Sequence, residues 1–290
     1  MLNINVDSVI NFLDGNELAR KYNVGEILKN INIFKIKKVM IGGGSDDEMT
    51  GSSGADAIWT GNGNNVVNSG GGNDFIIGGN GNDSISAGDG NDMIYGGDGK
   101  DFIDGGAGTD IIVAGLHGDK TVQAGDGIDV VVSGDGKDFL SGDDGNDLLF
   151  SGAGDDTLSG GSGSDMLGGG SGADSLFGGE GTDILWGGSG ADILEGGLGS
   201  DYYLWGAADG RDTIFGDNQD NVVMYNKKHD AFSLSLSDNN LVIAYDNNNS
   251  LTIDNWKNNS SATNLFTFAA EFGQSYKISE SNGHLSWLAV

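Results

Sequence analysis

The sequence has no cysteine, no proline and few basic residues. Its 290 residues include 43 acids but only 14 Lys or Arg, which gives a formal net charge of −29. Without cysteine, disulfides and thiolate-bound zinc or iron–sulfur centres are excluded. The acidic balance disfavours nucleic acid and anionic membrane surfaces, because both are bound through basic patches. A chain of this charge is expected to bind cations.

Long apolar runs are missing as well. No stretch reaches the ~18 apolar residues typical of a membrane-spanning helix, so no transmembrane segment is predicted. Residues 1–20 lack the basic start and apolar centre of a cleaved secretory signal. We therefore expect the protein either to stay inside the cell or to leave it by another route.

Glycine, in contrast, is abundant, with 54 residues that follow a nine-residue period. Units begin at 42 and recur to 114, and after one inserted residue they resume at 124 and continue to 204. Each has six turn-forming residues and then a strand-like triplet, as in GGNGNDSIS (78–86). The eighth position is apolar almost throughout, with Thr121 as the polar exception. Because one triplet cannot form a sheet, stacked copies are expected to share a core.

The sixth position of the unit is aspartate in every case except Asn65. The resulting motif, GGxGxDx(apolar)x, is nearly ideal in GGDGKDFID (96–104) and GGEGTDILW (178–186). It resembles the RTX (repeats-in-toxin) family, the haemolysin-type calcium-binding proteins of bacterial type I secretion. The resemblance is strong over 42–204 and moderate over 205–290.

The resemblance implies an all-β fold, a parallel β-roll (a β-solenoid) in which two nonapeptides make one coil. It also implies calcium held between successive turns by turn carbonyls and the sixth-position carboxylates. With Asp212 from a last echo of the motif, the implied metal ligands are Asp47, Asp56, Asp74, Asp83, Asp92, Asp101, Asp110, Asp119, Asp129, Asp138, Asp147, Asp156, Asp165, Asp174, Asp183, Asp192, Asp201 and Asp212.

The chemistry of these residues supports calcium independently of the resemblance. Stacked coils would bring aspartates of alternate units to about 4.8 Å, the spacing of paired strands. Carboxylates at that spacing repel one another, and Ca²⁺ takes hard oxygen ligands of this kind. Without calcium the segment should stay expanded, and with calcium the binding energy becomes folding energy.

The two edges of such a roll would each carry a column of aspartates. The column from Asp56 to Asp201 is unbroken, whereas the other contains Asn65 and the ten-residue unit AGLHGDKTVQ (114–123). We expect weaker metal binding or a local bulge at both of these places.

Other readings of the repeat fit less well. A disordered acidic segment would not keep an apolar residue at nearly every eighth position. An ice-binding solenoid would repeat Thr or Asn in its outward files, but the outward residues here vary. An EF-hand needs a bidentate Glu at loop position 12, which is absent.

Catalytic motifs are not evident, and the protein is predicted not to be an enzyme. The three histidines, His117, His229 and His284, form no HExxH pair, and there is no GxSxG sequence. The run GGGSGA (168–173) resembles a dinucleotide fingerprint but lies within the repeats.

Three regions are predicted. Residues 1–41 form an N-terminal cap with a helix (9–22) and a strand (31–41), and residues 42–204 form the roll of 18 repeats. Residues 205–290 form a capping β module, whose segments alternate in the manner of an antiparallel meander. Asp209 is a further candidate for a terminal ligand.

Two functions follow from these patterns. The first is a secreted, extracellular bacterial calcium-binding protein that folds after type I secretion and acts in adhesion, surface coating or host-cell interaction. Its partners would be calcium, the type I apparatus through a C-terminal signal, and a surface or host-cell target. The second is the repeat-bearing part of a larger toxin (haemolysin or cytolysin) or of a secreted enzyme such as a lipase, protease or epimerase.

Overall fold

The computed structural model describes residues 36–216, 219–225, 227–254, 256, 265–268, 274–281 and 284–290. The predicted N-terminal helix lies outside these residues. The described end of the predicted strand that precedes the repeats is β1 (Lys38–Ile41), which pairs in parallel with the strand of the second repeat.

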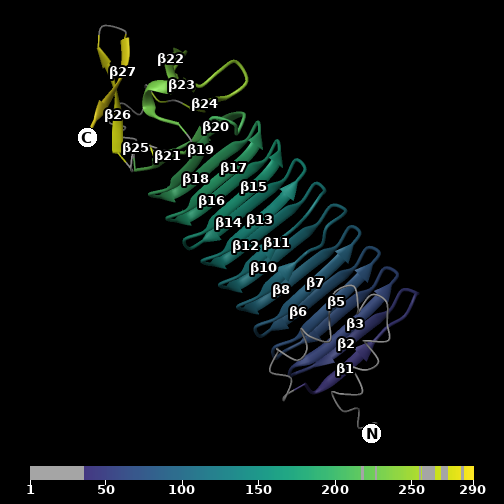
Figure 1. The fold of residues 1–290 in the computed structure, drawn as a ribbon. Coiled ribbons are helices and arrows are strands. Elements are labelled where there is room, and N and C mark those ends of the chain that lie inside the picture. The colour runs from purple at the N-terminus through teal and green to yellow at the C-terminus, as the bar shows by residue number, and fades with distance from the viewer. Residues whose placement is uncertain are drawn as a thin grey trace.

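Within the described residues the chain winds into an elongated stack of coils with two long sheets (Figure 1). Successive strands alternate between the sheets, which we call sheet A and sheet B. In order of pairing, sheet A contains β1, β3 (Asp56–Asn62), β5 (Phe75–Asn80), β7 (Met93–Asp98), β9 (Ile111–Val113), β11 (Val130–Val132), β13 (Leu148–Ala153), β15 (Met166–Gly172), β17 (Ile184–Gly190), β19 (Tyr202–Gly206), β21 (Asn221–Tyr225), β25 (Leu265–Phe268), β26 (Gln274–Ser281) and β27 (His284–Ala289).

Sheet B is built in the same way from the alternate units. In order of pairing it contains β2 (Glu48–Ser52), β4 (Val66–Gly70), β6 (Ser84–Asp89), β8 (Phe102–Gly108), β10 (Thr121–Gly127), β12 (Phe139–Gly145), β14 (Thr157–Ser162), β16 (Ser175–Gly181), β18 (Ile193–Gly199), β20 (Arg211–Phe215), β24 (Ser250–Ile253), β23 (Asn240–Ala244) and β22 (Ser233–Ser237).

The register makes two nonapeptides one coil. In sheet A, Ile76 pairs with Ile94, and in sheet B, Leu140 pairs with Leu158, so each eighth-position residue stacks on its equivalent one coil away. Because side chains alternate across a strand, this residue points inward while its neighbours point outward. Each of these four residues is at most 1% exposed. The core is therefore a double file of aliphatic residues between the sheets.

Larger side chains and antiparallel strands occupy the C-terminal end of the stack. Tyr203 and Trp205 extend the core there, and the Trp205 ring lies 5.6 Å from the ring of Phe232. Strands β22, β23 and β24 pair in antiparallel fashion on sheet B, and β25, β26 and β27 do so on sheet A. The predicted all-β parallel roll with antiparallel C-terminal strands is thus confirmed.

Helical structure is sparse in the part of the chain that the structure describes. It consists there of one short 3₁₀ turn, η2 (His229–Ala231). No helix among these residues has the length and apolarity needed to cross a membrane.

Candidate metal centres

The sixth residue of each unit ends a turn, at or directly before the next strand, and the coils align these residues in two columns. Column 1 leads into the strands of sheet A and column 2 into those of sheet B. Column 1 contains Asp56, Asp74, Asp92, Asp110, Asp129, Asp147, Asp165, Asp183, Asp201 and Asp220. Column 2 contains Asp47, Asn65, Asp83, Asp101, Lys120, Asp138, Asp156, Asp174, Asp192 and Asp212.

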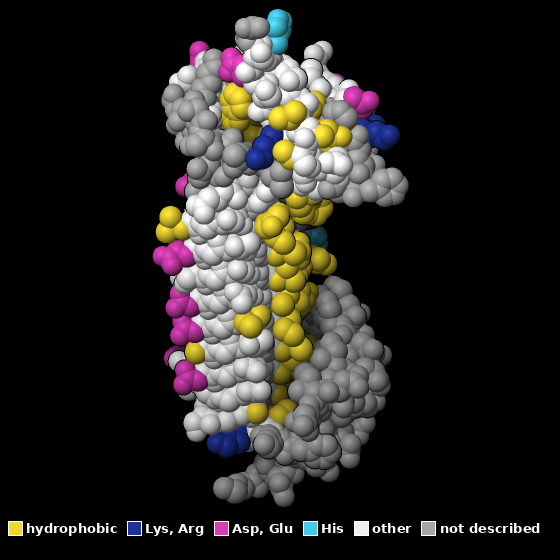
Figure 2. All heavy atoms as spheres, turned by 90° about the vertical axis from the view of Figure 1, so that its left-hand side faces the viewer, with side chains coloured by type: hydrophobic (Ala, Val, Ile, Leu, Met, Phe, Trp, Pro, Cys, Tyr) yellow, Lys and Arg dark blue, Asp and Glu magenta, His cyan; other side chains and the backbone are white. Residues whose placement is uncertain are grey.

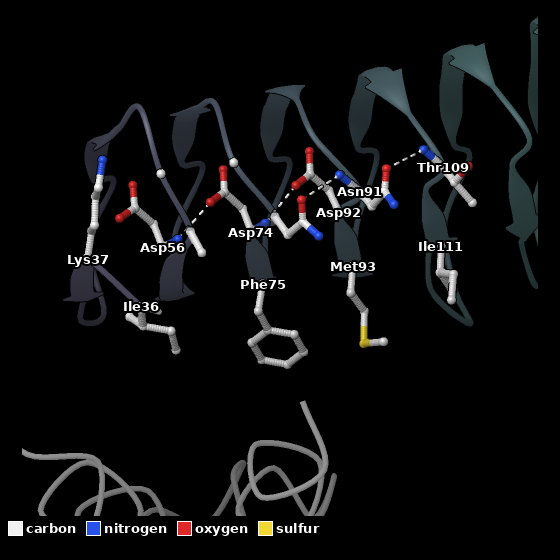
Figure 3. A pocket seen from close by; sticks show the side chains of 14 residues that line it. Ile36, Lys37, Asp56, Asp74, Phe75, Asn91, Asp92, Met93, Thr109 and Ile111 are labelled. Carbon is white, nitrogen blue, oxygen red and sulfur yellow. Dashed lines mark hydrogen bonds between the residues drawn. The ribbon is translucent and has the colours of Figure 1, made fainter. Parts of the chain in front are cut away.

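One oxygen of each typical carboxylate holds the columns together. The backbone N–H of Asp74 donates to Oδ1 of Asp92 at 2.7 Å, and that of Asp156 donates to Oδ1 of Asp174 at 2.8 Å. Figure 3 shows this arrangement at Asp56, Asp74 and Asp92, whose carboxylates point toward the turns while Phe75 points away. The aspartates are therefore structural acceptors as well as candidate ligands, a role that the sequence motif does not indicate.

The second oxygen, Oδ2, is buried and accepts no hydrogen bond in most repeats. A buried polar atom without a partner is destabilising, and a buried carboxylate needs a compensating charge. These oxygens, in both columns, belong to Asp74, Asp83, Asp92, Asp110, Asp129, Asp147, Asp156, Asp165, Asp174, Asp183 and Asp192. Their arrangement fits a row of cations.

Backbone carbonyls add further oxygen donors beside the carboxylates. In most turns the glycines at the second and fourth positions have positive φ, 109° at Gly97 and 134° at Gly99. A Cβ at these residues would lie 1.9 Å from the carbonyl oxygen of Gly79 and 2.0 Å from that of Gly81. Glycine is required because the carbonyls of one turn face the backbone of the next so closely.

This donor set favours a hard cation. No group of three or more His, Cys, Asp or Glu side chains gathers at one point among the described residues, so a site made of side chains alone is not found there. Carboxylates and backbone carbonyls together are the ligands that Ca²⁺ takes, six to eight at a time. The residues present therefore fit calcium.

The ten-residue unit departs from the sequence prediction. Asp119 was assigned to column 2, but Thr121 pairs with Phe102, and this register gives the column position to Lys120. Asp119 instead lies one residue earlier, with its side chain 46% exposed and bound to the Lys100 ammonium at 2.6 Å. The predicted place of Asp119 in column 2 is therefore wrong.

The same shift corrects the core position. Val122 is fully buried and Thr121 is exposed, so the eighth position is apolar here as elsewhere. The extra residue lies in the turn between β9 and β10, where Leu116 and His117 are exposed. The inserted residue changes the spacing along column 1 from 18 to 19 between Asp110 and Asp129.

Asn65 replaces an aspartate of column 2 but keeps its function as a hydrogen-bond acceptor. Its Oδ1 accepts the backbone N–H of Asp47 at 2.9 Å, as an aspartate would. Its Nδ2 donates to the carbonyl of Gly63 at 3.1 Å and to Oδ1 of Asp83 at 2.9 Å. An amide N–H thus occupies this carbonyl, which supports the expectation of weaker metal binding at this turn.

Comparison with known proteins agrees with this geometry. The family model of the RTX calcium-binding nonapeptide repeat matches residues 41–76, 77–112, 118–149, 132–167, 168–203 and 207–227, well over half of the chain. The chain belongs to this RTX family. Its repeats are accordingly calcium-binding repeats, and the predicted calcium cofactor is confirmed.

Two solved structures resemble this RTX chain at low identity. A hyperactive, Ca²⁺-dependent, β-helical antifreeze protein from an Antarctic bacterium is 17% identical, with a TM-score of 0.46, over 85% of this chain and 96% of that one. The extracellular lipase LipA from Serratia marcescens is 18% identical, with a TM-score of 0.22, over 69% of this chain and 42% of that one. Comparison with curated proteins gave no match.

Burial alters the acidity of the RTX aspartates. Desolvation raises the pKa of Asp92, Asp147 and Asp174 to about 7, with the charge of neighbouring column members adding to the effect. The hydrogen bond to Oδ1 opposes this shift but is the smaller influence. A cation would reverse the balance by favouring the ionised carboxylates.

Both columns continue into the region after the regular repeats. The backbone N–H of Asp192 donates to Oδ1 of Asp212 at 3.0 Å, so Asp212 lies in column 2 as the sequence predicts. Asp220 extends column 1 by accepting from Asp201 at 3.1 Å. Sequence reasoning missed Asp220 because the glycine period ends before it; the signal was an Asp directly before the strand-like NVVMY.

Asp209 lies outside the columns. Its Oδ2 accepts the backbone N–H of Gly206 at 2.8 Å, and its carboxylate also accepts the Tyr225 hydroxyl at 2.5 Å. With these partners Asp209 stabilises the turn before β20, and the geometry does not bring it into line with the repeat aspartates.

Proposed function

We propose that this RTX protein is a secreted bacterial protein whose repeats fold when they bind calcium outside the cell. The carboxylates of column 1 and column 2 supply calcium ligands, together with the backbone carbonyls of the glycines at the second and fourth positions of the turns. The work of the folded protein is non-enzymatic and consists of adhesion, surface coating or contact with a host cell. A C-terminal signal recognised by the type I apparatus accounts for export.

The row of buried Oδ2 atoms carries this proposal. Charged carboxylates packed at strand spacing repel one another, and the repeats offer few basic groups to offset them: residues 42–204 contain 29 acids and three bases. Calcium would neutralise the columns and supply the partners that the Oδ2 atoms need. Since the site exists only when the coils are stacked, its binding energy is folding energy.

The calcium affinity typical of extracellular modules fits folding outside the cell. Extracellular calcium modules typically bind with dissociation constants of about 10⁻⁴ to 10⁻³ M. Such repeats would stay unfolded at the low calcium level of the cytosol, which suits passage through a secretion channel. They would fold in the calcium-rich medium outside.

An apolar outer face supports a role in surface contact. Hydrophobic side chains gather in a band along the roll (Figure 2). On sheet A the outward residues Ile111, Val132, Met166, Trp186 and Tyr202 are each 38–43% exposed. Contiguous apolar patches on the surface of a protein often mark sites of interaction.

The alternative function is that of a repeat region within a larger RTX toxin or secreted enzyme. The same calcium chemistry would then stabilise a separate active domain. The sequence of the gene upstream of residue 1 distinguishes the two, because a catalytic or pore-forming domain encoded there would favour the alternative.

Circular dichroism under calcium control tests the proposal. We expect the chelated protein at neutral pH to give a coil spectrum, and calcium in the millimolar range to convert it to β. Magnesium at the same concentration should be much less effective, because it demands near-ideal octahedral geometry and dehydrates reluctantly. A β spectrum that is indifferent to chelation would contradict the proposal.

A further inference from the structure

Lys120 is the one lysine among the described residues whose side chain is fully enclosed. Lys120 is only 1% exposed. Lysines are almost never fully buried in proteins unless their charge is paired. Its Nζ donates to the carbonyls of Gly97 and Gly99 and to Oδ2 of Asp101, each at 2.7 Å. An ammonium has three N–H donors, and here all three are used.

These three acceptors have a definite place in the repeat. Gly97 and Gly99 are the second and fourth residues of the turn, and Asp101 is the sixth, so the lysine takes the oxygen set described above for a cation. In the same column, Oδ2 of Asp83 and of Asp156 has no hydrogen-bond partner, whereas Oδ2 of Asp101 has the ammonium. The positive charge thus lies where the neighbouring turns leave an uncompensated carboxylate.

The following turn of column 2 is also altered. It has Lys120 in the sixth position, so it contributes no carboxylate of its own. Across from it, Oδ2 of Asp138 accepts the hydroxyl of Ser133 at 2.5 Å. Both turns in contact with the lysine therefore differ from the typical site.

We propose that the Lys120 ammonium is a covalently attached substitute for calcium in the turn of residues 96–101. This inference rests on the proposed calcium sites of the other turns. It makes the two coils between Asp101 and Asp138 a segment whose column 2 turns need no metal, and it divides the calcium sites of column 2 into two separate runs. Column 1 passes this level with an unbroken set of aspartates.

The physical basis is the balance of charge in a buried site. One carboxylate facing one ammonium is neutral, and the two carbonyls satisfy the remaining N–H donors, which is the condition for tolerating a buried ion pair. A Ca²⁺ ion at the same place would have to displace the ammonium from all three of these oxygens. The tethered charge also pays no translational cost of binding, since it is already part of the chain.

Counting bound calcium in variants tests the inference. Lys120→Asp restores the repeat motif, and we expect it to bind at least one more calcium ion per chain than the unmodified protein. Lys137→Asp makes the same change of charge at an exposed residue one position before the column, and it should leave the count unchanged. Elemental analysis after removal of free calcium gives the number, and circular dichroism confirms that each variant is folded.

A crystallographic measurement on the unmodified protein decides the matter even if Lys120→Asp fails to fold. With calcium present, an anomalous difference map should show ions beside Asp83 and Asp174 but none within coordination distance of Oδ2 of Asp101. An ion at Asp101 would overturn the inference, and so would a folded Lys120→Asp variant that binds no more calcium ions than the unmodified protein. If the unmodified protein bound no calcium at all, the proposed function itself would fail instead.

Discussion

Each repeat aspartate divides two tasks between its two oxygens. Oδ1 of Asp129 accepts the backbone N–H of Asp110 at 2.7 Å, while its Oδ2 is buried without a hydrogen-bond partner. The first contact sets the spacing of the coils, and the second leaves a negative atom that a cation can bind. Asn65 shows that the two tasks separate, because an amide oxygen performs the first and an amide nitrogen cannot perform the second.

Asp129→Asn should therefore reduce calcium binding without breaking the ladder of hydrogen bonds. We expect the number of bound ions to fall by at least one and the calcium concentration at the folding midpoint to rise. Asp126→Asn removes the same charge three residues earlier from an exposed side chain, and calorimetric titration should find it close to the unmodified protein. Equal losses in both variants would show that overall charge, rather than the column, governs binding.

The turn is the element that determines how closely the coils approach. In most turns the second and fourth residues take positive φ and face the carbonyls of the preceding turn, as Gly163 does at φ 134°. Asp143 is an exception at a second position, with φ 68°, a left-handed conformation that aspartate tolerates better than most residues. Most other side chains at these positions would force the coils apart.

Gly163→Ala should destabilise the calcium-bound roll. A Cβ there would lie 1.4 Å from the carbonyl oxygen of Gly145, so backbone must shift. Strain of this kind, with the unfavourable φ, costs about 2 kcal/mol or more. At Gly43 a Cβ meets nothing within 4 Å, so Gly43→Ala should change the unfolding free energy far less. Thermal unfolding in saturating calcium compares the two variants, and similar midpoints would contradict this account of the turn.

At the scale of the molecule, the roll combines an apolar interior with an acidic, glycine-rich exterior. Two files of aliphatic residues fill the space between the sheets, and the column carboxylates lie along its edges. Antiparallel strands follow the last coil on both sheets, which limits the open edge that a parallel stack would otherwise present. The roll is consequently held by packing within and by charge neutralisation at the edges.

The raised pKa values predict a definite pH dependence. The pKa of Asp83, Asp110 and Asp183 is raised to about 6, and that of Asp92, Asp147 and Asp174 to about 7, chiefly by desolvation. A carboxyl whose pKa is higher in the folded state favours folding when protonated. Its contribution is complete below the unfolded value of 3.8 and is lost as pH rises through about 6 to 7.

In chelator, the metal-free protein should therefore gain β structure as the pH falls from about 7.5 to about 5, an interval that includes those pKa values. In the same interval protons compete with calcium for the folded columns, so the calcium affinity of the roll should fall. Circular dichroism in chelator at several pH values measures the gain of structure, and calorimetric calcium titration at the same pH values measures the affinity. If neither quantity changed with pH, the carboxyls would not be protonated in the metal-free roll.

The repeat itself was predictable because its signals are local and recur. Glycine at fixed positions dictates the turn, the triplet alternates as a strand must, and stacking follows because no unit can bury its apolar residue alone. The residues alone therefore predicted stacked strands, an aliphatic core and, apart from Asp119, the acidic columns of the repeats, and the resemblance to the RTX family implied the parallel roll. The C-terminal strands were predictable from alternation, although Asp220 was not, since the period had ended.

Tertiary structure decided which residue of the ten-residue unit is the extra one. In the sequence, Asp119 fits the sixth position when the count runs from Ala114, and the polar Thr121 at the eighth position is the one local sign against this count. Pairing with the neighbouring coils buries Val122 rather than Thr121, and the strand that enters the sheet is shifted by one residue. Because side chains alternate along a strand, that shift exposes Asp119 and encloses Lys120, and only the contacts with Gly97, Gly99 and Asp101 reveal what the lysine replaces.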